Sequence, residues 1–263
     1  MLRKTLLTVL AMTLVIALPI PAQEPLIPVE EELPYLTLEE ILRNYYGAIG
    51  GDEAWADIDS MKMDGLVQMG PGMDLAFVVY TSRPDQMRLE FTTQGLLGVQ
   101  AIDGEQAWLV DLGGRQPRAM PEDLEKRLRR QLDIEGPLID WSAKGHLLEV
   151  LEAGESLGRD AYRIKMTRDD GTVETYHFDA ETFRLFLVEG TTTLQGTEVE
   201  SETLMSNFNM VGDGLMLAHT IESRIKGRPG GQVIKVETVE IGLDVSAVQF
   251  AMPTAAAPET ADE

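Results

Sequence analysis

Apolar and polar residues alternate along most of the chain from Ser60 onward. In the stretch SMKMDGLVQM, residues Met61, Met63, Val67 and Met69 fall on one face of an extended segment, with polar residues between them. The same period of two, or a short run that is apolar on both faces, recurs as far as the segment QVIKVETVEI. Glycine, proline or aspartate turn signals separate these segments. This pattern predicts about ten to twelve antiparallel β-strands.

The segment before these strands, residues 37–58, predicts two short helices. Thr37 can cap a first helix whose apolar residues form one stripe, and Asp52 can cap a second that carries Trp55. Between them, YYGAIGGDEAW places three glycines where the first helix must end. A phosphate-binding loop needs a preceding strand and the spacing GxxxxGK[ST] or GxGxxG, and this stretch has neither. We therefore interpret the glycines as a joint between two helices.

A third helix is expected within the strand region, at PEDLEKRLRRQL. Pro121 stands at its start, and Leu124, Leu128 and Leu132 recur every four residues, which is typical of a helix with one apolar stripe. A further helical piece is expected from Pro137 to Lys144.

Basic residues gather on this third predicted helix, although the chain carries a formal net charge of −22. One interpretation is a solvated helix face stabilised by pairs with acidic residues four positions earlier. The other is a docking surface for lipid phosphate or for an acidic partner. The four residues concerned are Lys126, Arg127, Arg129 and Arg130.

The N-terminal residues have the form of a secretory signal peptide. Arg3 and Lys4 precede an uncharged stretch that ends at Ala22. Its apolar run of about 14 residues is shorter than the roughly 20 residues that a membrane-spanning helix needs. We expect cleavage after Ala22 and export to the periplasm, with an uncleaved membrane anchor as the alternative. The sequence contains no cysteine, so disulfide bonds and lipidation of a cysteine are excluded.

Composition divides the rest of the chain into three parts. Residues 23–34 are rich in proline and glutamate and predict an extended leader, residues 35–253 predict a single domain, and residues 254–263 predict a disordered tail. The chain has 44 acidic and 22 basic residues, which argues against nucleic acid as a partner. We expect a monomer.

The sequence offers few candidates for catalysis. Its three histidines, at positions 146, 177 and 219, are far apart in sequence, so no metal site is expected, and no cofactor motif occurs. The segment GESLG, residues 154–158, matches the nucleophile-elbow pattern GxSxG around Ser156. That chemistry needs a strand, a sharp turn and a helix, whereas the flanking segments predict the two strands of a hairpin. We therefore expect Ser156 to be a solvent-facing turn residue with no nucleophilic role.

The first three predicted strands share an apolar face that is rich in methionine. Flexible thioethers fill irregular gaps and also line surfaces that accept varied apolar ligands. The face is therefore either a plain packed core or the lining of an apolar ligand cavity. The candidate lining residues are Met61, Met63, Val67, Met69, Leu75, Phe77, Val79, Leu89 and Phe91.

Several motifs together resemble a known family. They are YYGAIGGDEAWADIDSMKMDG, RPDQMRLEF, IDGEQAWLVD, LEAGESLGRDAYRIKM, FNMVGDGLMLAHTIES and FAMP, and they span roughly residues 38–253. In this order they resemble the LolA-like superfamily of periplasmic lipoprotein carriers, and in particular the members called outer membrane lipoprotein-sorting proteins. None of the motifs is catalytic.

The resemblance implies an α+β fold. Its expected form is a strongly curved antiparallel sheet, an unclosed barrel, whose concave apolar face accepts acyl chains beneath a lid of short helices. The implied function is a non-catalytic periplasmic binding or carrier protein for a lipid, a lipoprotein acyl chain or a similar ligand, with transient contacts to a membrane or an envelope protein. Two alternatives stay open: a structural or adaptor protein of the envelope with a self-filled core, and, more remotely, a serine hydrolase acting through Ser156.

Overall fold

The computed structural model describes residues 33–70, 72–194 and 196–253. The predicted signal peptide, most of the predicted leader and the predicted C-terminal tail lie outside these residues. Within the described ranges, no helix is long and apolar enough to cross a membrane.

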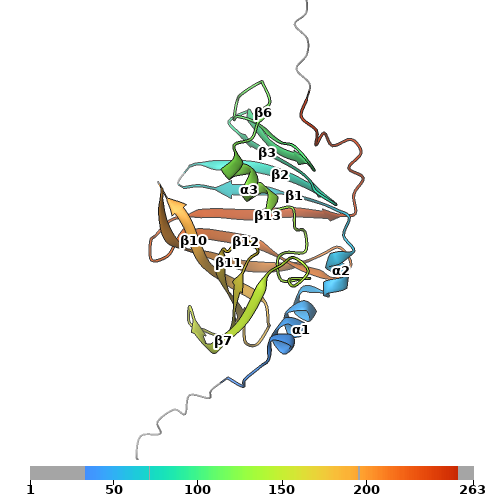
Figure 1. The fold of residues 1–263 in the computed structure, drawn as a ribbon. Helices are drawn as coiled ribbons and strands as arrows, with labels where there is room; N and C mark the ends of the chain where they lie inside the picture. The colour runs from blue at the N-terminus through green and yellow to red at the C-terminus, as the bar shows by residue number, and fades with distance from the viewer. Residues whose placement is uncertain (1–32, 71, 195, 254–263) are drawn as a thin grey trace, which may run out of the picture. The chain divides into compact units, whose positions relative to one another are not determined.

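In the described residues, thirteen strands form one antiparallel sheet that is not closed into a barrel (Figure 1), one more than the upper end of the predicted ten to twelve. The order across the sheet is β6-β5-β4-β3-β2-β1-β13-β12-β11-β10-β9-β8-β7. The prediction of a curved antiparallel sheet is confirmed. The strands are β1 (Ser60–Gln68), β2 (Asp74–Ser82), β3 (Gln86–Thr93), β4 (Leu96–Asp103), β5 (Ala107–Val110), β6 (Arg118–Ala119), β7 (Leu147–Ser156), β8 (Arg159–Thr167), β9 (Val173–Asp179), β10 (Leu185–Leu194), β11 (Thr197–Val211), β12 (Leu215–Ile225) and β13 (Gln232–Ile241).

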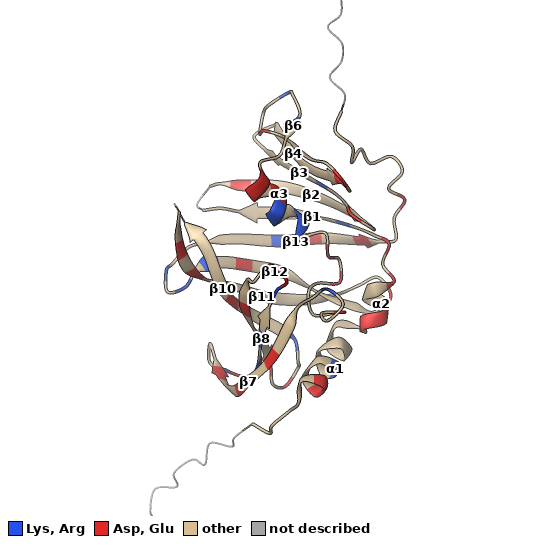
Figure 2. Cartoon of the chain, viewed as in Figure 1, with Lys and Arg blue, Asp and Glu red and all other residues tan. Residues whose placement is uncertain are grey.

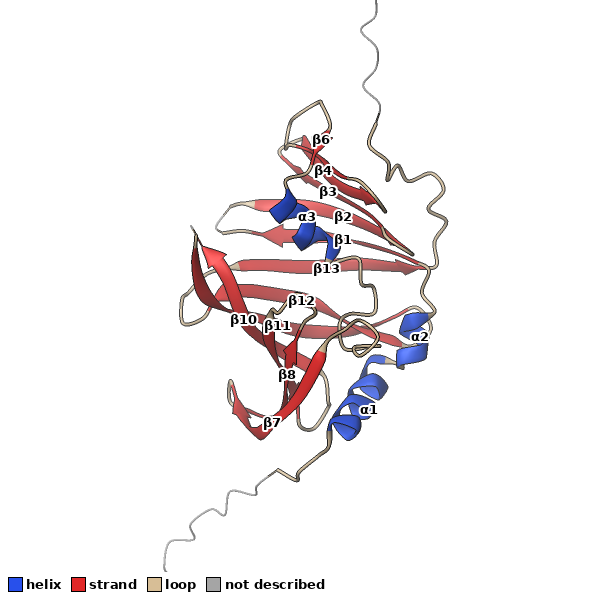
Figure 3. Cartoon of the chain, in the orientation of Figure 1, coloured by secondary structure: helices blue, strands red, loops and turns tan. Residues whose placement is uncertain are grey.

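The chain enters this sheet in the middle. Strands β1 to β6 fill one half outward to an edge, and β7 to β13 fill the other half from the opposite edge back to β1. The connection between the two edges, residues 120–146, must therefore pass from one half to the other, and we call it the crossing segment. It contains helix α3 (Glu122–Arg129), which lies in front of β1 and β2 (Figure 3).

The two N-terminal helices form as predicted, with one difference. Helix α1 (Leu38–Ile49) begins with a capping box between Thr37 and Glu40, and Gly50 ends it with a φ of 99°. A side chain at Gly50 would lie 2.5 Å from the carbonyl oxygen of Gly214, so the glycine also permits close packing against the sheet. Helix α2 (Asp52–Ala56) follows at once, which confirms the joint. Its N-cap is Gly51, and Asp52 lies in its first turn rather than capping it.

The predicted helical piece from Pro137 to Lys144 is wrong, because these residues form turns. Asp140 has a φ of 51°, in the left-handed region, and a right-handed helix cannot continue through such a residue.

Three apolar clusters lie on the face of the sheet that the helices cover, which we call the concave face. The α1 cluster joins Ile41 and Leu42 to strands β8, β9 and β10. The α3 cluster joins Leu128 to strands β1 to β5 and β13. The third cluster lies between α2, the crossing segment and the start of β12. On the opposite, convex face, Trp108 packs with Val99 and donates a hydrogen bond of 2.7 Å to the carbonyl of Phe250.

Candidate ligand-binding face

The centre of the predicted apolar face lies beneath helix α3. Cross-strand pairing places Met63 beside Val79 and Val79 beside Leu89, so the parity argument for a common face holds. Phe77 and Val79 are each 7% exposed, and Met63, Val67 and Leu89 are partly buried against the same cluster. Three leucines of the crossing segment pack in this cluster: Leu124, Leu128 and Leu132.

Four of the nine predicted lining residues lie outside this cluster. Met61 is buried, but in the neighbouring cluster with Trp55 and Ile49. Met69 is 53% exposed and follows the end of β1 at Gln68. Leu75, at the start of β2, is half-buried.

Phe91 is the fourth of these residues, and its ring leans on the next strand. Phe91 pairs with Gly98 across β3 and β4, and a side chain at Gly98 would come within 2.3 Å of the Phe91 ring. The ring therefore covers a glycine, which is a known way of filling the gap that a glycine leaves in a sheet.

The sequence interpretation missed residues that complete the α3 cluster from strands β4, β5 and β13 and from the start of the crossing segment. Alternation along β4 and β5 was a usable signal for Ile102 and Leu109. The missed residues are Ile102, Ala107, Leu109, Met120 and Val236.

The four basic residues of α3 do not form one free surface. Lys126 pairs with Glu122 at 2.7 Å, as expected. The expected pair between Arg127 and Asp123 does not form among the described residues. Arg129 instead pairs with Glu125 at 2.8 Å and also donates to the carbonyls of Gly104 and Glu105. Figure 2 shows acidic and basic residues side by side on this helix. Arg127 is exposed and forms no ion pair with any residue that the structure describes.

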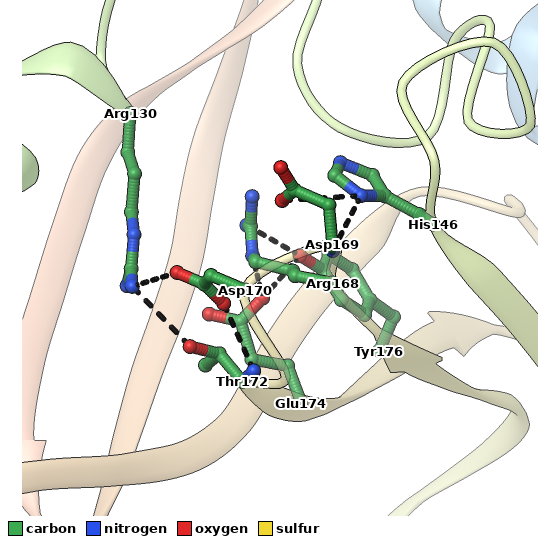
Figure 4. Close-up of polar contacts among 8 residues, drawn as sticks. All are labelled: Arg130, His146, Arg168, Asp169, Asp170, Thr172, Glu174 and Tyr176. Carbon is green, nitrogen blue, oxygen red and sulfur yellow. Dashed lines mark hydrogen bonds and ion pairs between the residues drawn. The ribbon is translucent and has the colours of Figure 1, made fainter.

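Arg130 reaches across the concave face to the β8–β9 hairpin (Figure 4). It donates to a carboxylate oxygen of Asp170 and, at 3.2 Å, to the hydroxyl of Thr172. Hydrogen bonding from Thr172, with a smaller contribution from Arg130, lowers the pKa of Asp170 to about 2. The Asp170 carboxylate is therefore charged over the whole physiological range.

The same hairpin carries a second polar group, also drawn in Figure 4. Arg168 donates to Glu174 at 2.8 Å and to the hydroxyl of Tyr176 at 3.1 Å. The Tyr176 hydroxyl donates to Glu174 at 2.7 Å, and burial raises its pKa. His146 accepts a hydrogen bond of 3.3 Å from the backbone N–H of Asp169. The hairpin is thus fixed as a rigid partner for Arg130.

The far part of the crossing segment is held by a buried carboxylate. Glu135 pairs with Arg83 and, at 3.1 Å, with Lys144, and its side chain is 8% exposed. Arg83 also donates to the carbonyl of Ile58 at 2.7 Å. The Tyr46 hydroxyl donates to the carbonyl of Leu138 at 2.7 Å, and burial raises the pKa of Tyr46 to about 12. Polar contacts therefore hold the crossing segment on both sides of the face.

Ser156 lies on the convex face in a hydrogen-bonded series with His177 and Glu189. The Ser156 hydroxyl is 2.8 Å from Nδ1 of His177, and Nε2 of His177 is 3.0 Å from a carboxylate oxygen of Glu189. Lys226 donates to the other carboxylate oxygen of Glu189 at 2.7 Å. Burial lowers the pKa of His177, so its ring is neutral near pH 7: Nε2 donates to Glu189, and Nδ1 accepts from Ser156.

The expectation that Ser156 faces solvent is wrong, because the residue is 8% exposed. The expected hairpin is confirmed: β7 ends at Ser156, and β8 begins at Arg159 after a two-residue turn. Ser156 pairs with Arg159 in the ladder, so the serine lies on a strand end and not on a strand-to-helix turn. The series has the partner order of a hydrolase triad, but it lies in a different backbone setting, where it links β7, β9 and β10.

No group of three or more potential metal ligands occurs among the described residues. No family model matches the sequence, and no curated protein matches it.

Solved structures show the same architecture. A LolA superfamily protein from Nitrosomonas europaea matches with a TM-score of 0.54 at 16% identity, covering 82% of this chain and 98% of that chain. The chain has the LolA-like fold. An outer membrane lipoprotein-sorting protein domain from Vibrio parahaemolyticus matches with a TM-score of 0.51 at 13% identity, covering 78% and 93% of the two chains.

The LolA-like fold also extends to a protein of the DUF1329 family from Desulfovibrio piger. Its TM-score is 0.54 at 9% identity, and the match covers 79% of this chain and 97% of that chain. The resemblance drawn from the sequence motifs is therefore confirmed at the level of the fold. Identities of 9 to 16% carry fold information alone, so function has to be argued from the residues of this chain.

Proposed function

We propose that this chain is a non-catalytic carrier for a lipid, a lipoprotein acyl chain or a similarly apolar molecule. It would work in the periplasm, in the sorting of outer-membrane lipoproteins or lipids. The observation that carries the proposal is the α3 cluster, in which an apolar stretch of the concave face is covered by one short amphipathic helix. The predicted lining residues, including those outside the α3 cluster, are kept as part of this proposal.

The helix has a structure suited to a movable cover. It has eight residues and reaches the cluster through leucines. Most of its other residues face solvent or form surface ion pairs, and Arg129 also donates to the carbonyls of Gly104 and Glu105. Exposed ion pairs contribute at most about 1 kcal/mol each. Lifting α3 would expose a contiguous apolar surface, which soluble proteins avoid unless something covers it. An acyl chain is a ligand of suitable shape and polarity to take that place.

The comparison supports the same proposal. One of the structures with this fold is described as an outer membrane lipoprotein-sorting protein domain. In this chain the fold carries an apolar concave face, which is the architecture that an acyl carrier needs.

Native mass spectrometry of protein purified from its own periplasm tests the proposal. We expect a fraction of the protein to carry an added mass that organic extraction releases and identifies as a lipid. Protein that is uniformly ligand-free, with no lipid in the extract, would contradict the carrier function.

One observation favours the adaptor alternative. Phe77 and Val79 are already packed against the cover, so the concave face is filled by the chain's own side chains in this state. The two functions differ in whether α3 can leave. An adaptor needs it to stay, whereas a carrier needs it to open.

We also propose that Arg127 is the residue of α3 that contacts an anionic surface. Its three basic neighbours already pair with acidic side chains. A single free guanidinium gives weak, salt-sensitive attraction, which suits a transient contact.

A further inference from the structure

The concave face changes character along strands β11, β12 and β13. Near the middle of the sheet, Met205 pairs with Ile221, and Ile221 pairs with Ile234. Ile234 packs against the α3 cluster, which fixes this row on the concave face. Two residues further along each strand, the same face carries hydroxyl and amide groups, because alternate residues share a face. These groups belong to Thr203, Ser223 and Gln232.

An open groove of about 520 Å³ lies at this polar end of the concave face. No lining residue is acidic, although the chain as a whole carries a net charge of −22. The polar side chains that line this groove include Thr192, Ser201, Thr203, Ser223, Arg228 and Gln232.

Two arginines border the groove, and they differ in what they already bind. Arg224 donates to Glu202 at 2.9 Å and to Glu222 at 3.3 Å, so its charge is compensated. Arg228 forms no ion pair with any residue in the described ranges. It lies in the turn between β12 and β13, where a side chain at Gly231 would come within 2.3 Å of the Ser223 carbonyl oxygen. The glycine lets this turn pack closely against β12, and Arg228 lines the same groove as Thr203 and Ser223.

Hydroxyl donors beside a free guanidinium form a suitable site for a phosphate group. The hydroxyls of Thr203 and Ser223, on neighbouring strands, are hydrogen-bonded to each other at 3.2 Å. One O–H is used in that bond, and the other hydroxyl keeps its O–H for a ligand. An arginine offers several N–H donors in a planar arrangement that matches phosphate oxygens. A carboxylate in the lining would repel such a ligand, and the groove has none.

We propose that this groove binds the phosphate-bearing head group of an amphiphile whose chain lies on the apolar row toward the α3 cluster. The inference rests on the proposed carrier function and adds the ligand class: a phospholipid or a similar phosphate ester with acyl chains. The head group sits at Thr203, Ser223 and Arg228, and the chains run past Ile221 and Ile234.

The decisive comparison uses two lipids that differ only in the phosphate group. Dihexanoyl phosphatidic acid and dihexanoylglycerol are titrated calorimetrically, below micelle-forming concentrations, into the wild type, Arg228→Gln and Lys235→Gln. Lys235 is the matched control, because it is exposed on β13 and alternates with Ile234, so it faces the convex side. We expect the wild type and Lys235→Gln to bind the phosphate lipid about tenfold more tightly, a typical effect of charge-assisted hydrogen bonds. Arg228→Gln should lose most of this preference and retain the affinity for dihexanoylglycerol.

A second variant tests the hydroxyl groups without altering charge. The double substitution Thr203→Val and Ser223→Ala keeps the side-chain volumes close and should weaken binding of the phosphate lipid by a few-fold.

The remaining outcomes separate this inference from the proposed function. Equal wild-type affinity for the two lipids, or a preference that survives Arg228→Gln, would overturn the head-group site and leave the carrier function standing. Glycerol 3-phosphate binding as tightly as the phosphate lipid would show a site for free phosphate and would overturn the amphiphile. Binding of neither lipid would contradict the carrier function itself.

Discussion

Arg130 and Asp170 connect the two halves of the concave face, one from the end of helix α3 and the other from the β8–β9 hairpin. Both side chains are partly exposed, at 45% and 42%, so the pair adds little to global stability. Its importance lies in its position, because it ties the cover of the α3 cluster to a hairpin on the other half of the sheet.

Arg130→Gln should therefore speed ligand uptake without unfolding the protein. Removing an exposed pair worth at most about 1 kcal/mol should raise the open population, and with it the uptake rate of a fluorescent fatty acid, about two- to fivefold. The measurement is stopped-flow fluorescence together with urea unfolding. Arg127→Gln, on the same helix, is the control and should leave the rate unchanged. Equal uptake rates in Arg130→Gln and the wild type would show that the ion pair does not restrain α3.

The docking proposal predicts an effect of Arg127 at low ionic strength. Arg127→Glu should weaken association with vesicles containing phosphatidylglycerol, because screening is least there and the wild-type side chain has no competing partner. Flotation of protein with vesicles at low and at physiological salt measures this. Glu53→Gln, an exposed change on α2, is the control. If Arg127→Glu floats with the vesicles as well as the wild type does, the basic residues of α3 form only a solvated surface and no docking site.

Ser156 is predicted to have no nucleophilic role despite its partners. It is buried at a strand end, and its hydrogen bond to His177 satisfies a group that would otherwise be unpaired. A fluorophosphonate probe should label the wild type no more than Ser156→Ala. Labelling that disappears in Ser156→Ala would support the hydrolase alternative instead.

His177 should make stability depend on pH below neutrality. Burial lowers its pKa from the ordinary value of 6.5, opposed by Glu189 and assisted by Arg163 and Lys226. A lowered folded-state pKa means that the unfolded chain takes up the proton first. This contribution to stability is therefore complete above about pH 6.5 and is lost as the pH falls through the folded-state value.

Urea unfolding at pH 7.5 and pH 5.5 measures that contribution in the wild type and in His177→Gln. The wild type should lose more stability between these values than His177→Gln does. A slope that is the same in both proteins would rule out His177 as its source.

Local patterns predicted much of the fold. The period of two located the strands, and Thr37 and the glycines after Ala48 defined the first helix because capping and helix termination depend on neighbouring residues. Parity alone placed Phe77 and Val79 on one buried face, since alternation along a strand is geometric.

Those local patterns could not predict contacts between segments that are distant in the sequence. The partner of Arg130 lies forty residues away in sequence, in a hairpin that only the crossing segment brings near. Ser156 meets His177 and Glu189 because three strands, one with a register shift at Leu185/Leu187, turn these side chains to the same face. The failed helix at Asp140 has a different cause, a single left-handed residue that propensities for the surrounding segment do not reveal.

The central claim is that the surface beneath α3 is a ligand face and not simply a core, and two phenylalanines test it most directly. Phe77 lies under α3 and Phe186 lies in a cluster on the convex face, at 7% and 5% exposure, so they are matched in type and burial. Both are changed to alanine, and each variant is measured for its free energy of unfolding and for its affinity for a fluorescent fatty acid.

Phe186→Ala should lose roughly 3 to 5 kcal/mol, as expected for a packed core, and keep its probe affinity within about twofold. Phe77→Ala should lose clearly less stability, because the short helix α3 can move into the space, and should bind the probe several-fold more weakly. Wild-type protein that binds no probe, together with equal destabilisation by the two substitutions, would show that the concave face is only a packed core.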